Sequence, residues 1–297
     1  MSTVAREGIP RRQSVRVLRH FASARGAEVA ALQGSPLLGM YLANPGLHPS
    51  LFGRQALLLL GSIALTAHVF LFNDWADFRR DTGDQRREGL GVGGYGIDRS
   101  RIADLAIALL VLAAIAFAAA GVAAMSCGAG IAALSAVYSF SPRLGKSTPI
   151  AASLNHLVGG ALHFLLGYSL AHAVDARGFA LSLVFGLVFA AGHLNQEVRD
   201  YNSDRENSVR TVAVAIGPQR GFVLSFCLFT AAYALIVVLA AVGVLPKLLL
   251  LSVIPWMVQS RWSLQALRRG LASETAVWVQ RRYRLLFALV GLAMLIR

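Results

Sequence analysis

Charged residues are scarce in this chain. Only 14% of its 297 residues are Asp, Glu, Lys or Arg, whereas a soluble domain carries about 25%. Hydrophobic residues make up 56%, in blocks of roughly 17–25 residues that are each long enough to cross a hydrocarbon layer about 30 Å thick. The alternating segments of about ten residues that a membrane barrel requires are missing. The composition therefore excludes a single soluble core and predicts a helical membrane protein.

Cysteine is also rare. Cys127 and Cys227 lie in separate apolar blocks, without the close spacing of a metal or redox pair. Residues 1–26 carry six arginines and lack the apolar core of a cleavable signal peptide. We interpret them as a basic cytoplasmic N-terminal tail, followed by a single transmembrane domain over residues 27–297.

The predicted fold class is an all-α integral membrane protein, with nine transmembrane helices around a central cavity and an active site at the cytoplasmic side. Hydropathy places the spans at about 27–44, 53–76, 101–119, 121–138, 149–174, 178–198, 218–243, 245–267 and 273–296. With this topology, 24 of the 28 Lys and Arg residues fall on the side of the N-terminus. Such an asymmetry is typical of cytoplasmic loops, so we expect a cytoplasmic N-terminus in a bacterial-type cell membrane.

The net charge of +13 does not point to nucleic acid. Basic residues sit in the connections between apolar blocks and do not form one amphipathic face with interleaved aromatic residues. This distribution sets membrane orientation and contacts anionic headgroups. The expected partner is therefore the lipid bilayer, and no nucleic acid.

An acidic stripe follows the second predicted span. Asp74, Asp77 and Asp81 are spaced i, i+3 and i+7, with Asn73 directly before them. At 3.6 residues per turn this spacing places the three carboxylates on one face of a helix. Like charges stacked in this way repel each other. A divalent cation reverses that effect, because Mg²⁺ bridges carboxylates to phosphate oxygens.

The same pattern recurs after the sixth predicted span. Glu197, Asp200 and Asp204 repeat the spacing, with Gln196 in the place of the amide. Both copies lie at the cytoplasmic end of an even-numbered span, and ionisable groups at membrane depth usually face an interior cavity. Two such clusters facing each other predict a Mg²⁺-bound diphosphate, which the ions stabilise as a leaving group. An apolar cavity would then exclude water from an allylic carbocation.

A third polar segment is predicted on the same side, between the fourth and fifth spans. Tyr138 can donate a hydrogen bond to a phosphate oxygen, and Arg143 or Lys146 can add positive charge. Polar residues within spans are candidates for contact with an acceptor substrate, although packing is the alternative for each. They are His68, Asn155, His156, His163 and His193.

Together these segments resemble the UbiA superfamily of intramembrane prenyltransferases, over nearly the whole chain. That family carries an NDxxDxxxD motif after its second helix, a second acidic motif after its sixth, and a Tyr-Ser with a basic residue after its fourth. The stretch Arg210–Val214 with Gly217 also looks like a family segment. One departure lies at residues 85–94, where the prolines of a KRPLPSG-like segment are missing, which leaves room for a specialised-metabolite enzyme.

The resemblance implies transfer of a prenyl group from an isoprenyl diphosphate to an aromatic or quinone-precursor acceptor, with release of pyrophosphate. Asp77, Asp81, Asp200 and Asp204 would be catalytic. Diphosphate contacts would come from Asn73, Tyr138, Arg143 and Lys146. The implied cofactor is Mg²⁺, held by Asn73, Asp74, Asp77, Asp81, Glu197, Asp200 and Asp204.

Two other functions remain open from the sequence. A membrane terpene cyclase of the same superfamily would use the same donor without an external acceptor. A cation-coupled transporter could also use repeated acidic residues. The acids here lie at helix ends beside long polar loops and not at mid-span breaks, which disfavours transport. Chain length of the donor, identity of the acceptor, the proton-accepting base and the oligomeric state are not determined by the sequence.

Overall fold

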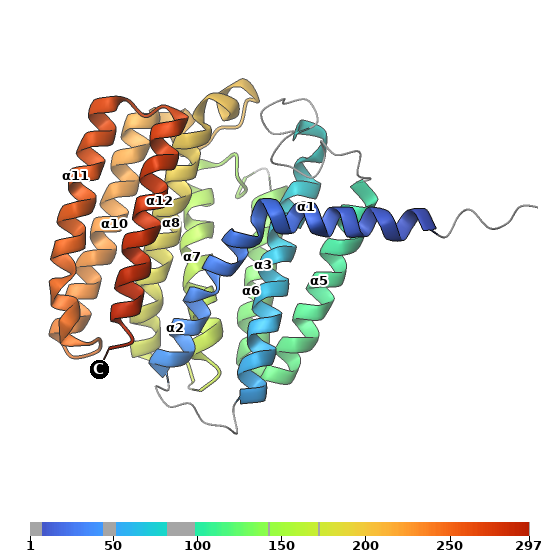
Figure 1. The fold of residues 1–297 in the computed structure, drawn as a ribbon, viewed down its shortest axis with the longest axis horizontal. Coiled ribbons are helices and arrows are strands. Elements are labelled where there is room, and N and C mark those ends of the chain that lie inside the picture. The colour runs from blue at the N-terminus through green and yellow to red at the C-terminus, as the bar shows by residue number, and fades with distance from the viewer. Residues whose placement is uncertain (1–7, 44–51, 82–98, 142, 172, 297) are drawn as a thin grey trace, which may run out of the picture. The chain divides into compact units, whose positions relative to one another are not determined.

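A computed structural model describes residues 8–43, 52–81, 99–141, 143–171 and 173–296 of the chain (Figure 1). All regular elements in these residues are helical, which confirms the predicted all-α class. The helices are α1 (Gly8–Leu32), α2 (Gly34–Ala43), α3 (Phe52–Asp81), α5 (Arg99–Ala120), α6 (Val122–Phe140), α7 (Pro149–Tyr168), α8 (Ala176–Glu206), α9 (Val212–Ile216), α10 (Pro218–Ala241), the 3₁₀ helix η3 (Lys247–Ser252), α11 (Val253–Arg269) and α12 (Ser273–Ala293).

Six of these helices, α3, α5, α6, α7, α8 and α10, are long and apolar enough to cross a membrane in the described part of the chain. Nine spans were predicted, and that number is not confirmed. The helix α2 has only 10 residues, and α11 and α12 carry arginines within their length. Large apolar side chains nevertheless remain exposed on many helices, as expected for surfaces that contact lipid.

The predicted first span at 27–44 is divided between two helices. α1 continues from Gly8 to Leu32, across the boundary proposed at residue 26, and α2 starts at Gly34. Gln33 breaks the run, because its side chain donates from Nε2 to the carbonyl oxygen of Val29 at 2.9 Å and accepts from the Ser62 hydroxyl at 2.6 Å. Pro36 then lies in the first turn of α2, where its missing donor is tolerated.

The described residues form two compact units, residues 1–33 with 53–135 and residues 34–52 with 136–297. In the first unit, α1 lies across α3 and α5 (Figure 1), and Phe21 and Val29 of α1 pack against apolar residues of both. Phe117 of α5 sits between Gly61 and Gly128, where a Cβ would lie 2.6 and 2.5 Å from its ring. Small residues thus allow α3 and α6 to approach α5 closely.

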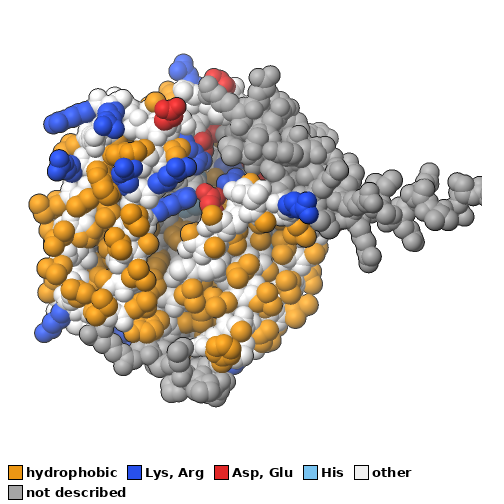
Figure 2. Space-filling view, in the orientation of Figure 1, with side chains coloured by type: hydrophobic (Ala, Val, Ile, Leu, Met, Phe, Trp, Pro, Cys, Tyr) orange, Lys and Arg blue, Asp and Glu red, His pale blue; other side chains and the backbone are white. Residues whose placement is uncertain are grey.

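In the second unit, α8, α10, α11 and α12 run side by side (Figure 1). α2 packs against α7 so closely that a Cβ on Gly167 would lie 1.9 Å from the Pro36 carbonyl oxygen. Over α10, α11 and α12, hydrophobic side chains cover most of the visible face and Lys and Arg gather towards one end (Figure 2). This banding is typical of a membrane-embedded bundle with one basic face.

Both helices that carry the acidic motifs exceed the thickness of the hydrocarbon layer. α3 has 30 residues and α8 has 31, so each is about 45 Å long at 1.5 Å per residue. The layer itself is about 30 Å thick. Each helix is therefore longer than the layer is thick, and the acidic residues lie in its C-terminal turns.

Candidate functional site

The acidic end of α3 is mostly buried within the first unit. Asp74 and Asp77 are each 8% exposed, one turn apart on the same face. The Asn73 side-chain oxygen is buried, and no hydrogen-bond donor reaches it in the described part of the chain. A buried carbonyl oxygen of this kind fits a ligand for a cation. Asp81 ends the helix, and its side chain lies outside the described residues.

The α3 end is held by contacts from α5. The Arg99 guanidinium lies 4.5 Å from the centre of the Trp75 ring, and its Nε donates to the Trp75 carbonyl oxygen at 3.2 Å. Trp75 stacks on Phe72 at 5.7 Å, and Phe72 stacks on His68 at 5.3 Å. His68 in turn donates from Nδ1 to the carbonyl oxygen of Ala106 at 2.8 Å. These contacts fix the helix that carries Asp74 and Asp77.

The acidic end of α8 has a different environment in the second unit. Arg199 donates to Asp200 through both Nε (2.9 Å) and Nη2 (2.7 Å), and the Asp200 side chain is 39% exposed. Asp204 is 6% exposed. Among the described residues, no group of three His, Cys, Asp or Glu side chains is placed to hold a metal ion.

Lys146 lies near Asp204 because of a tight turn after α6. Gly145 donates to the Ser141 carbonyl oxygen at 3.0 Å, and Lys146 donates from its backbone to the Tyr138 carbonyl oxygen at 3.0 Å. A Cβ at position 145 would lie 2.3 Å from the Ser141 carbonyl oxygen, so the turn requires glycine. Burial lowers the pKa of Lys146 to about 8, and the negative charge of Asp204 opposes this shift. Arg143, the other predicted cation, is exposed in the same turn.

Tyr138 lies against a pair of histidines. The rings of His156 on α7 and His193 on α8 stack at 3.6 Å, only 7° from parallel. The Tyr138 ring meets them edge-on, at 5.1 Å from His156 and 6.0 Å from His193. The structure therefore brings together two histidines that the sequence could only name as separate candidates. His163 lies two turns from His156 and contacts Phe189 instead.

Glu197 lies one turn after His193 on α8. Its Oε1 lies 3.0 Å from His193 Nε2, and its Oε2 accepts from the backbone N–H of Ala213 at 3.3 Å. The residue is 4% exposed. Thr211 caps α9 by accepting from Val214 at 3.3 Å, which holds the N–H of Ala213 in place. The leading acid of the second motif thus contacts a histidine and a backbone donor.

Sequence reasoning missed Arg99 and the backbone N–H of Ala213. Arg99 is separated from Trp75 by 24 positions along the chain. The only sequence signal for their contact is an aromatic residue inside an acidic motif, which attracts a cation to its ring. The contact of Ala213 with Glu197 has no such signal, because any residue other than proline supplies the same backbone donor.

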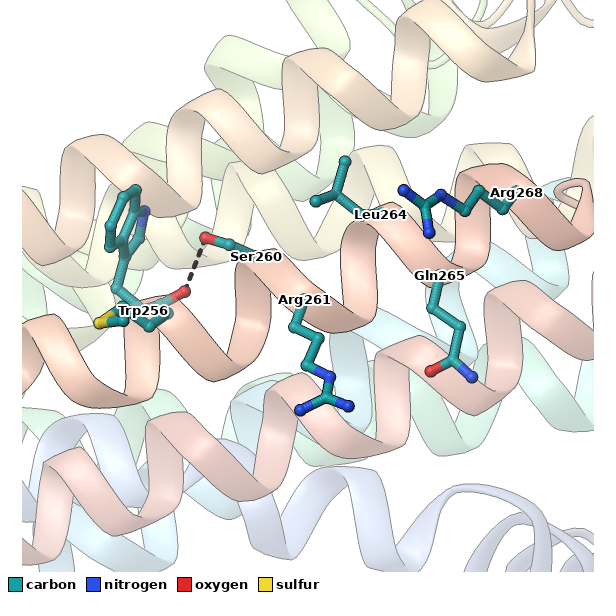
Figure 3. Close-up of a pocket in the computed structure, with 7 residues that line it drawn as sticks. Trp256, Ser260, Arg261, Leu264, Gln265 and Arg268 are labelled. Carbon is teal, nitrogen blue, oxygen red and sulfur yellow. Dashed lines mark hydrogen bonds between the residues drawn. The ribbon is translucent and has the colours of Figure 1, made fainter.

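A surface hollow of about 560 Å³ lies along α11, away from these residues (Figure 3). Its lining includes Arg261, Gln265 and Arg268, and Ser260 donates to the Trp256 carbonyl oxygen at 2.8 Å. It contains none of the predicted site residues and no carboxylate. It is therefore not a candidate for the metal–diphosphate site.

Comparisons with known proteins bear on the family and on the fold. A model of the UbiA prenyltransferase family matches residues 34–290. A UbiA homologue from Archaeoglobus fulgidus bound to GPP and Mg²⁺ has a TM-score of 0.69 at 20% identity, covering 95% of this chain and 99% of that chain. An apo UbiA homologue from Aeropyrum pernix K1 has a TM-score of 0.64 at 15% identity, covering 89% and 96%.

A structure from a study of digeranylgeranylglyceryl phosphate synthase in membranes has a TM-score of 0.68 at 16% identity, covering 95% of this chain and 98% of that chain. Identities this low show a shared fold. No curated protein sequence matches the chain.

Proposed function

The chain belongs to the UbiA prenyltransferase family, and we propose that it transfers a prenyl group from an isoprenyl diphosphate to an aromatic or quinone-precursor acceptor, releasing pyrophosphate. The observation that carries this proposal is the acidic pattern at the ends of α3 and α8. Three of its described carboxylates, on Asp74, Asp77 and Asp204, are no more than 8% exposed. Carboxylate oxygens are the ligands that Mg²⁺ prefers, so this pattern is suited to hold the ion.

Mg²⁺ is the proposed cofactor, and the residues present fit it. The donors are carboxylate oxygens and the buried, unpartnered oxygen of Asn73, which are the hard ligands that Mg²⁺ prefers. When bound, Mg²⁺ neutralises the diphosphate and stabilises it as a leaving group. We assign ligation to Asn73, Asp74, Asp77, Asp81, Asp200 and Asp204. Glu197, also expected among these ligands, already contacts His193 and Ala213.

Lys146 and Arg143 are the proposed cationic contacts of the diphosphate, and Tyr138 a proposed hydrogen-bond donor to it. Lys146 is partly buried near Asp204, and its ammonium group can donate charge-assisted hydrogen bonds to phosphate oxygens. Arg143 is exposed, so it is suited to meeting the diphosphate as it arrives from water. The A. fulgidus homologue, bound to GPP and Mg²⁺, supports the use of such a donor.

The membrane supplies the remaining requirement of the reaction. Cleavage of an allylic diphosphate leaves a carbocation that water would quench, so the reacting carbon needs a dry, apolar environment. Six helices of the described residues, α3 and α8 among them, are long and apolar enough to supply such an environment within a membrane. We propose that the chain is oriented with its N-terminus in the cytoplasm, since most Lys and Arg residues then lie on the cytoplasmic side.

The test uses the full-length protein, purified in detergent, with geranyl diphosphate, Mg²⁺ and a panel of aromatic acceptors. We expect pyrophosphate release and a prenylated product that require Mg²⁺, and loss of both in Asp77→Ala. Full activity of Asp77→Ala would contradict the proposal. A cyclic terpene formed without any acceptor would identify a cyclase instead, and cation uptake into proteoliposomes that depends on Asp77 and Asp200 would identify a transporter.

A further inference from the structure

The surface hollow of about 560 Å³ along α11 changes in polarity from one end to the other (Figure 3). Towards the start of the helix it is lined by Trp256 and Met257, and towards the end by Arg261 and Arg268. Leu264 lies between the two arginines. An apolar section therefore adjoins a section that carries two positive charges, and the lining contains no carboxylate.

Four of the lining residues form one outward face of α11. Met257, Arg261, Leu264 and Arg268 are spaced i, i+4, i+7 and i+11, which places them on one side of a helix. All four are exposed, Met257 to 60% and Leu264 to 56%. In Figure 3 the Arg268 side chain runs back along the helix towards Leu264. Arginines and large apolar side chains are thus offered together to whatever surrounds this face.

The two arginines of the hollow differ from their neighbours in having no partner of their own. The Arg282 guanidinium lies 4.0 Å from the centre of the Trp278 ring, and that of Arg269 lies 5.7 Å from the same ring. Arg261 and Arg268 have neither an aromatic ring nor a carboxylate as partner within the described residues. Their donors are therefore available to a bound anion.

The chemistry of the lining matches a phosphate group attached to apolar chains. A guanidinium donates pairs of parallel hydrogen bonds to phosphate oxygens, and the half-exposed amide of Gln265 adds another donor. A free phosphate would leave Met257 and Leu264 without an apolar partner. A prenyl diphosphate with its Mg²⁺ would find no carboxylate here to hold the metal. The ligand that satisfies both sections is an anionic phospholipid without a metal.

The direction of α11 agrees with the direction of a lipid in a leaflet. α8, α10 and α11 follow one another up and down the second unit, so the C-terminal end of α11 lies at the same end as the acidic end of α8 (Figure 1). A headgroup at Arg261 and Arg268 would lie towards that polar end. Its acyl chains would then run along the apolar start of the helix, where Ile254 and Val253 are also exposed.

We propose that the hollow along α11 is a binding site for an anionic phospholipid. Arg261 and Arg268 hold the phosphate, and the acyl chains lie against Met257 and Leu264. The site is separate from the metal–diphosphate site and requires neither Mg²⁺ nor the prenyl donor. It selects anionic lipids over zwitterionic ones, because a choline headgroup brings a positive charge close to the two arginines.

The test titrates the delipidated full-length protein in detergent with dioleoyl phosphatidylglycerol or dioleoyl phosphatidylcholine, and counts bound lipids by native mass spectrometry. The two probes share their acyl chains and differ in headgroup charge. We expect phosphatidylglycerol to bind about tenfold more tightly, the effect of charge-assisted hydrogen bonds to its phosphate. Equal affinities in the wild-type protein would overturn the proposal without any variant.

Two competitors distinguish the lipid from other anions. Glycerol phosphate carries the headgroup without acyl chains, so it should not displace phosphatidylglycerol at equal concentration. Geranyl diphosphate with Mg²⁺ should not displace it either, because the lining lacks ligands for the metal. Full displacement by glycerol phosphate would identify a site for free anions, and displacement by geranyl diphosphate would identify a second donor site. Either result would overturn the proposal.

Variants then locate the effect in the hollow. Arg261→Gln combined with Arg268→Gln should bring the affinity for phosphatidylglycerol down to that for phosphatidylcholine. Leu264→Ser should weaken both lipids and keep their ratio. Arg220→Gln, which removes an exposed arginine outside the lining, is the matched control and should keep the preference. A preference that survives in the double variant would overturn the proposal. Binding is measured without donor or Mg²⁺, so the result does not depend on prenyl transfer.

Discussion

The ends of α3 and α8 carry the same acidic pattern in different surroundings. At the α3 end the leading acid, Asp74, is preceded by Asn73, whose side-chain oxygen is buried without a partner. At the α8 end the leading acid, Glu197, contacts His193 and the N–H of Ala213. The position before the second acid also differs, being Ala76 in one copy and Arg199 in the other. A repeated motif therefore need not have a repeated function at each position.

The largest expected effect comes from the acids that the two ends share. Asp77→Asn and Asp200→Asn should each lower the rate of prenyl transfer by about 1000-fold, since a metal ligand contributes several kcal/mol to charge stabilisation. Added Mg²⁺ should restore part of the loss. The measurement is kcat/KM at several Mg²⁺ concentrations. Asp104→Asn, which removes an exposed carboxylate on α5, is the matched control and should change nothing.

The next largest effect concerns Lys146, which lies in the turn after α6 and near Asp204 at the end of α8. Lys146→Met should raise the KM for the diphosphate donor by about 10- to 100-fold, because it removes a charge-assisted contact. Burial lowers the pKa of Lys146 to about 8, so its charge is present below that pH and is lost as the pH rises through it. Donor KM should therefore rise above about pH 8 in the wild-type protein.

Lys146→Arg provides the control for this pH effect. An arginine stays charged throughout the range, so donor KM in this variant should lose its rise above about pH 8. An unchanged pH profile in Lys146→Arg would show that another group titrates.

Substitution of the first acid of each motif, Asp74 on α3 and Glu197 on α8, compares the functions of the two helix ends directly. Glu197→Gln should leave the Mg²⁺ requirement unchanged, because the Glu197 side chain lies against His193 and accepts from the Ala213 N–H. Asp74→Asn should do the opposite and raise the Mg²⁺ requirement. Steady-state kinetics with each substrate and with Mg²⁺ varied in turn gives this split. If Glu197→Gln needs more Mg²⁺, then Glu197 is a metal ligand as the sequence pattern predicted.

The smallest effect concerns Arg199, the residue directly before the second acid of the α8 motif. Arg199→Ala makes the α8 end resemble the α3 end and frees Asp200 from its bidentate partner. Partly exposed pairs contribute about 0.2–1 kcal/mol, so the Mg²⁺ concentration for half-maximal activity should fall by about two- to fivefold. Arg220→Ala removes an exposed arginine at the start of α10 and serves as control. No change in Arg199→Ala would mean that the pair does not compete with Mg²⁺.

Helix boundaries were predictable wherever hydrophobic length governed them. The predicted span at 121–138 corresponds to α6 (Val122–Phe140), because an apolar run must form a helix when it enters lipid. The span at 27–44 was wrong as a single helix. The sequence showed an interruption at Pro36, and the structure places the break between the helices at Gln33, whose side chain bonds to Val29 and Ser62. The bond to Ser62 depends on the neighbouring helix α3, and a hydropathy pattern does not show it.

In the candidate site too, local relations were predictable from the sequence and contacts between helices were not. The spacing of Asp74 and Asp77 was enough to place them on one face, since helix periodicity fixes that relation. The stacking of His156 on His193 joins residues 37 positions apart on two helices. It depends on the close packing of α7 against α8, where a Cβ on Gly160 would lie 2.6 Å from Phe189.

By itself, the sequence determined that the chain is a helical membrane protein with two acidic helix ends, because hydrophobic length and helical period are local properties. It also identified the family, through the order and spacing of its motifs. Only the tertiary structure decided that Glu197 contacts His193, that Lys146 lies near Asp204, and that two histidines form one polar pair. These relations arise from packing between helices, and that packing is set by shape complementarity over the whole chain.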